Sequence, residues 1–98
     1  TMKIADETGI VRERKILFSS YPSAKMRFYF VDGSYADIFV NVKKEKIYYF
    51  WLKITGEKYQ VNNYPPHGWH EHVNDKRIPR RQMSPKEFFA KVKKELKS

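Results

Sequence analysis

The chain has 98 residues, of which 41% are hydrophobic and 16% aromatic, so we expect one folded domain over residues 1–98 and exclude a disordered chain. Lys and Arg number 20 against 11 Asp and Glu, and the net charge of +9 attracts polyanions, which points to nucleic acid, RNA before DNA. No apolar run approaches the roughly 18 residues of a membrane span, so we expect no membrane contact. The N-terminus shows no export signal and cysteine is absent, so we expect a cytoplasmic protein.

Alternating side chains predict a first pair of strands in the middle of the chain. Apolar and polar residues alternate over residues 24–31, which is typical of a half-buried strand. The sequence Asp-Gly-Ser at 32–34 then indicates a turn, and a second strand follows over 35–42. A register that places Phe28 opposite Ile38 keeps one face apolar, so we expect that pairing.

Two further strands complete the expected sheet. A charged turn at 43–46 leads into residues 47–54, which are mostly apolar and aromatic with few polar residues among them, as is typical of a central strand. Residues 58–62 return as a short strand. Residues 11–20 are compatible with either an edge strand or a short helix. The prediction is an antiparallel meander of four to five strands, with the sheet over about residues 24–62.

A loop and a helix are expected to end the chain. Residues 63–83 are rich in His and Arg, show no periodicity and contain three prolines, so we expect an irregular loop there. The helix over 84–97 has a clear start, because Ser84 is a capping residue, Pro85 follows it and Glu87 completes a capping box. Its apolar stripe is expected to pack on one face of the sheet, which makes the fold α+β.

All three histidines of the chain lie within six residues: His67, His70 and His72. Imidazole suits proton transfer near neutral pH, so two of them can act as acid and base on the 2′-hydroxyl and the leaving oxygen of RNA. The same three side chains can instead bind a divalent transition metal such as zinc, or can simply be polar loop residues. Spacing does not separate these three interpretations, and the acid–base one leads.

A basic run follows the histidines, with its members at Lys76, Arg77, Arg80 and Arg81. Arginine binds phosphate through two parallel hydrogen bonds, so this run is a candidate phosphate-binding element. The alternative is an ordinary solvated surface.

One face of the predicted sheet is a candidate binding surface. If even-numbered residues of the strands face the helix, the opposite face carries these residues: Tyr29, Tyr35, Phe39, Tyr49 and Trp51, with Arg27, Asn41 and Lys53 among them. Aromatic rings interleaved with cations can stack nucleobases. A surface of this kind can equally be a protein interface, so we expect it to be covered by RNA, by an acidic protein partner or by a second copy in a homodimer.

The order of these motifs resembles the TumE-type toxin family. The resemblance rests on the Asp-Gly-Ser turn at 32–34, the aromatic segment 48–51 and the segment Val61-Asn-Asn-Tyr-Pro-Pro-His-Gly-Trp-His-Glu-His-Val73, and it runs over residues 26–96. It implies the toxin component of a prokaryotic toxin–antitoxin pair that acts on RNA and is held by a cognate antitoxin.

The resemblance assigns the family's histidine segment to His67, His70 and His72. The sequence departs from the family at Asn62, where Asp is common, and at Pro66, where His is common. The leading expectation is therefore a toxin-like ribonuclease without a required cofactor. The alternatives are a non-catalytic module that binds nucleic acid or protein, and a metal-binding protein.

Overall fold

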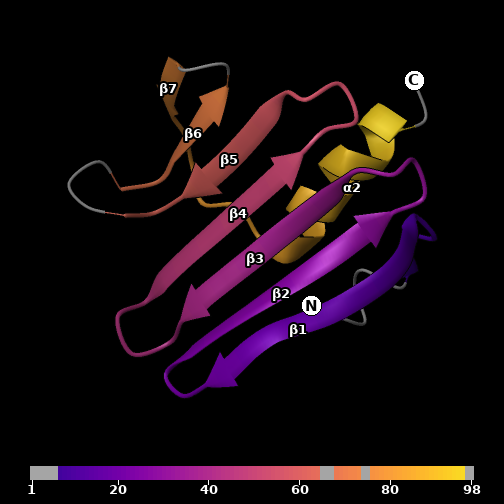
Figure 1. Ribbon diagram of the computed structural model, residues 1–98. Coiled ribbons are helices and arrows are strands. Elements are labelled where there is room, and N and C mark those ends of the chain that lie inside the picture. The colour runs from indigo at the N-terminus through magenta and orange to yellow at the C-terminus, as the bar shows by residue number, and fades with distance from the viewer. Residues whose placement is uncertain (1–6, 65–67, 74–75, 97–98) are drawn as a thin grey trace.

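Seven antiparallel strands form one sheet in chain order, and a single long helix follows them in the computed structural model (Figure 1). The structure describes residues 7–64, 68–73 and 76–96. The elements are β1 (Val11–Ser20), β2 (Ser23–Phe30), β3 (Tyr35–Asn41), β4 (Lys46–Leu52), β5 (Lys58–Asn62), β6 (His70–Val73), β7 (Lys76–Pro79) and α2 (Pro85–Leu96). The meander and the C-terminal helix are thus confirmed, and the fold is α+β.

The strand count exceeds the expected four to five. Residues 11–20 form the edge strand β1, which pairs with β2 and has two irregularities in its register, between Val11 and Glu13 and between Ile16 and Phe18. The expectation of an irregular loop over 63–83 is wrong where β6 and β7 form a hairpin beside β5. These two strands have four residues each, too few to show a period. The pairing of β6 with β5 and of β7 with β6 supplies the backbone hydrogen bonds that local sequence does not specify.

The turn between β2 and β3 forms where the sequence predicts it. Gly33 has a φ of 94°, and the Ser34 N–H donates to the Asp32 carboxylate at 2.8 Å. The expected register is wrong by two residues, because Phe28 lies opposite Ala36 and Ile38 lies opposite Met26. A shift of two preserves which side chains share a face, so the apolar face of these strands is as expected.

The turn between β3 and β4 exchanges odd and even positions. Asn41 pairs with Lys46, five positions later, and the turn between them includes Glu45 at a φ of 52°. Because the separation is odd, even residues of β3 share a face with odd residues of β4. Ile38 therefore lies opposite Tyr49.

Tyr49 and Trp51 are consequently core residues, and their predicted place on the exposed face is wrong. Tyr49 is fully buried, stacks on Phe88 at 5.0 Å between ring centroids, and donates its hydroxyl to the Met83 carbonyl at 3.1 Å. Trp51 is 2% exposed, and its Nε1–H donates to the Ser34 hydroxyl at 3.1 Å. Burial raises the pKa of Tyr49, so its hydroxyl remains a donor at neutral pH.

The helix begins at the predicted capping box and packs on one face of the sheet. The Glu87 N–H donates to the Ser84 hydroxyl at 3.2 Å, and the Ser84 N–H points back to the Glu87 carboxylate at 3.5 Å. Phe88 and Phe89 are fully buried, and the Phe89 ring meets Phe28 edge-on at 5.1 Å. Within the described residues, no helix is long and apolar enough to span a membrane.

Candidate nucleic-acid interface

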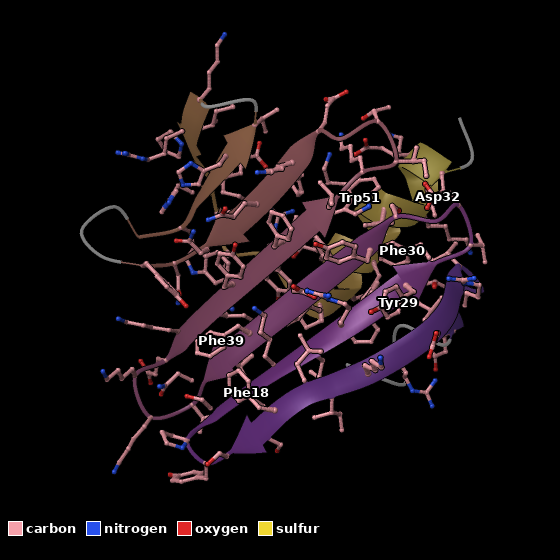
Figure 2. The ribbon with its side chains drawn as sticks, viewed as in Figure 1. Phe18, Tyr29, Phe30, Asp32, Phe39 and Trp51 are labelled. Carbon is pink, nitrogen blue, oxygen red and sulfur yellow. The ribbon has the colours of Figure 1, made fainter. Side chains whose placement is uncertain are left out.

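The sheet has one face packed against α2, the helix face, and one face turned away from it, the open face. In Figure 2 the open face is toward the viewer and α2 lies behind the sheet. Strand register places these aromatic residues on the open face: Phe18, Tyr29, Tyr35, Phe39, Tyr48 and Phe50. Phe18 and Phe39 lie side by side there, with their ring centroids 6.1 Å apart (Figure 2). Rings left partly accessible on a sheet can serve as a surface for stacking.

Five of the aromatic rings form a continuous series across the sheet, which we name the aromatic track. It runs in the order Tyr29, Tyr35, Phe50, Tyr48 and Tyr64, with successive ring centroids 6.2, 6.4, 6.4 and 6.3 Å apart. Every member is half-buried, so each ring is held by its neighbours and still reaches the surface. Burial raises the pKa of Tyr48 and of Tyr64, so their hydroxyls are protonated donors at neutral pH.

Cations lie on this track at two points. The Arg27 guanidinium stacks over the Tyr35 ring at 4.3 Å, and it also donates two hydrogen bonds to Asp37 at 2.7 and 2.9 Å. Those hydrogen bonds outweigh the cost of burial and raise the pKa of Arg27. Lys46 lies over the Tyr64 ring at 5.2 Å. Arg27 thus orients a ring of the track, whereas Lys46 adds a positive charge at its far end.

Two of the three candidate histidines are in direct contact on β6. The Nε2 atoms of His70 and His72 are 3.0 Å apart, and the His70 Nδ1 lies 2.7 Å from the Gly68 carbonyl oxygen. Residues two apart in a strand point to the same side, so this contact follows from β6 being a strand. His67 lies outside the described residues.

The Gly68 carbonyl determines how this histidine pair shares its protons. A carbonyl only accepts, so the His70 Nδ1 carries a hydrogen. In the tautomer whose single N–H is at Nδ1, the His70 Nε2 is an acceptor for the Nε2–H of His72. His70 is 5% exposed and His72 is half-buried, so His72 is the outer member. This sequence of acceptor, buried imidazole and outer imidazole is the arrangement that orients a general base.

The histidine pair lies on the open face, two strands along the sheet from Tyr48 of the aromatic track. Tyr48 lies opposite Asn62 in the β4–β5 pairing, and Asn62 lies opposite His70 in the β5–β6 pairing. Arg77 lies opposite His72 in the β6–β7 pairing, and its side chain is exposed. A cation beside an imidazole is the combination that phosphoryl-transfer chemistry uses.

Comparison with family models, with curated proteins and with solved structures found no match for this chain. The resemblance to the toxin family therefore remains a prediction. Among residues 7–64, 68–73 and 76–96, no three His, Asp or Glu side chains form a group that could hold a metal ion. The third ligand of the metal interpretation, His67, is outside those ranges.

Several predicted binding residues lie on the helix side of the sheet instead. Lys53 donates to Glu95 of α2 at 2.9 Å, Arg81 pairs with Glu87 at 3.0 Å, and Arg80 pairs with Glu71 at 3.2 Å. Lys76 is exposed and lies opposite Val73, which packs against the core. Of the predicted basic set, the structure brings only Arg27 and Arg77 to the open face.

Sequence reasoning missed Tyr48, Phe50 and Tyr64 as members of the surface. Tyr48 and Phe50 alternate with Tyr49 and Trp51, so the sequence shows four consecutive aromatic residues without indicating which pair faces inward. The turn after β3 determines which of the two pairs faces the core. Tyr64 follows β5 in a segment without periodicity, where only its proximity in space to Tyr48 reveals it.

Proposed function

We propose that this protein binds single-stranded RNA on its open face and cleaves it at the His70–His72 pair. The observation that carries the proposal is the aromatic track on the open face, where only Asn62 of the intervening strand β5 separates Tyr48 of the track from His70. A stacking surface and a proton-transfer pair on the same face of a sheet can act on one bound strand.

Stacking on the track explains a preference for single strands. Every nucleobase has a π-face, so a series of rings accepts successive bases with little regard to sequence. A duplex hides those faces, so half-buried rings on a sheet face stack with unpaired bases rather than with paired ones. The net charge of +9 supplies the long-range attraction for the phosphates.

The chemistry distinguishes RNA from DNA. His72 takes the proton of a 2′-hydroxyl at Nδ1, the nitrogen on the far side of its ring from His70, while its Nε2–H moves toward His70. The 2′-oxygen then bonds to phosphorus, the bond from phosphorus to the 5′-oxygen breaks, and the pair returns one proton to that leaving oxygen. Arg77 stabilises the charge that develops on the phosphate. One proton is taken and one is returned, so the step balances.

The proposal extends to the role of a toxin-type protein with an acidic partner. The net charge of +9 makes the protein complementary to an acidic protein, and such a partner would compete with RNA for the same charges. This part rests on the charge and on the resemblance in the segment 61–73. Such a pair would act in the cytoplasm, and a homodimer through the open face is the competing arrangement.

A cleavage assay under enzyme excess tests the proposal. The parent should cut an unstructured RNA, and His72→Ala should slow that cutting at least a hundredfold, the size of effect expected for a general base. An oligonucleotide with one 2′-deoxy position should resist cleavage at that position only. Equal cutting by the parent, His72→Ala and His70→Ala would contradict the proposed chemistry.

The non-catalytic alternative has its own outcome in the same assay. Salt-dependent binding to RNA without any cutting at enzyme excess would show that the aromatic track works alone. That result would keep the binding half of the proposal and remove the histidine half.

A further inference from the structure

Arg80 follows β7 directly and is the centre of a polar cluster on the helix side of the sheet. Its Nη1 donates to the Glu71 carboxylate at 3.2 Å and lies 3.4 Å from the Tyr59 hydroxyl. The Tyr59 hydroxyl donates to the same Glu71 oxygen at 2.7 Å. Burial is the larger cause and the hydrogen bond with Glu71 the smaller one of a raised pKa at Tyr59, so this hydroxyl remains protonated at neutral pH. The sequence predicted a phosphate ligand at Arg80, and the structure shows a guanidinium enclosed by protein groups.

The contacts of Arg80 involve both chain neighbours of His70. The Arg80 backbone N–H donates to the Trp69 carbonyl at 3.2 Å, and its side chain holds Glu71. Trp69 precedes His70 and Glu71 follows it. One residue therefore restrains the backbone on both sides of the inner histidine.

Strand geometry transmits this restraint through the sheet. Successive side chains of a strand point to opposite faces, so Glu71 is directed to the helix face while His70 and His72 are directed to the open face. β6 has only four residues and belongs to the last hairpin of the sheet. A strand so short and so near an edge depends on side-chain contacts for its exact position.

The cluster is also connected to the helix. Arg80 Nη2 lies 4.0 Å from the Glu87 carboxylate, and Arg81 pairs with that carboxylate at 3.0 Å. Glu87 belongs to the first turn of α2, whose Phe88 and Phe89 are fully buried. Arg80 thus links β6 to an element that the core holds in place.

We propose that Arg80, acting through Glu71, is a positioning residue for the His70–His72 pair. It touches neither histidine side chain in the contacts described above, and its effect is to keep the two Nε2 atoms within hydrogen-bond distance. The catalytic part of this inference rests on the proposed function, whereas the geometric part does not.

The test begins with the protein alone, without RNA. In protein with ¹⁵N-labelled histidine, the hydrogen bond between the two imidazoles gives a coupling between their Nε2 nuclei, because they are 3.0 Å apart. Arg80→Ala should reduce that coupling at least by half. Glu71→Gln preserves the size of the side chain and weakens the same ion pair, so it should act in the same direction. Arg81→Ala is the matched control, since Arg81 pairs with Glu87 of α2 whereas Arg80 pairs with Glu71 of β6.

Kinetics supply the second readout. Arg80→Ala should lower kcat roughly tenfold to hundredfold with KM within about twofold, because displacement of a catalytic group affects the chemical step more than binding. Arg81→Ala should leave both constants within about twofold. Thermal unfolding curves check that each variant is folded at the temperature of the kinetic assay.

The outcomes separate this inference from the proposed function. A coupling that is lost in Arg80→Ala and Glu71→Gln but kept in Arg81→Ala supports the positioning role, even if the parent cuts no RNA. A parent without the coupling, or folded Arg80→Ala and Glu71→Gln variants that retain it in full, would overturn the inference while leaving RNA cleavage to be judged by its own assay.

Discussion

Replacement of Phe50 by alanine removes the middle ring of the aromatic track. Phe50 lies 6.4 Å from Tyr35 on one side and 6.4 Å from Tyr48 on the other, so its loss leaves those two rings without the stacking surface between them. Stacking of a base on an aromatic side chain contributes about 1–3 kcal/mol. We therefore expect the Kd for a short unstructured RNA to rise roughly fivefold to a hundredfold.

Fluorescence anisotropy with a labelled RNA at two salt concentrations measures this effect. The number of phosphate contacts should not change, so the dependence of Kd on salt should have the same slope in Phe50→Ala as in the parent. Tyr49→Phe is the matched control, because this neighbour in β4 faces the core and loses only its bond to the Met83 carbonyl. If folded Phe50→Ala binds RNA as tightly as the parent, the track is not the binding surface.

Three further predictions concern the core, the ion pairs and metal dependence. Trp51→Lys should unfold the protein or destabilise it by more than the roughly 3–5 kcal/mol of a Trp→Ala change, because it buries a charge where Trp51 is 2% exposed. Chemical denaturation measures this loss of stability. A stable variant with altered assembly would contradict the assignment of Trp51 to the core. The hydrogen bond from Arg81 lowers the pKa of Glu87 below its ordinary 4.5; burial opposes this shift and the hydrogen bond with Ser84 adds to it. The ionised carboxylate therefore stabilises the fold above pH 4.5, and this stabilisation is lost as the pH falls through the lowered pKa. Denaturation of the parent and Glu87→Gln should thus differ at pH 7 and converge in acid, and a constant difference would refute the linkage. Removal of divalent metal with a chelator should leave RNA cleavage unchanged if the histidine pair acts by proton transfer, whereas loss of activity that zinc restores would favour the metal interpretation.

Local sequence determined the elements whose signals lie within a few residues of one another. The Ser84–Glu87 capping box specifies where α2 begins, since both of its hydrogen bonds are made within one turn. The Asp32-Gly33-Ser34 turn is specified by a glycine with positive φ and by an aspartate that caps the next residues. The bounds predicted for the strand at 58–62 are those of β5. The proximity of His70 and His72 also follows from local geometry, because residues two apart in a strand share a side.

Tertiary structure decided which aromatic residues became surface and which cations remained on it. The odd separation across the turn after Asn41 buried Tyr49 and Trp51 and exposed the side of β4 that carries Tyr48 and Phe50. The β6–β7 hairpin forms because β6 pairs with the edge of β5, and no periodicity in the sequence predicts it. Arg80 faces the helix side because Glu71 and Glu87 lie there, brought together from β6 and α2. Each of these outcomes depends on residues that meet only in space, so no pattern along the chain encodes them within a single segment.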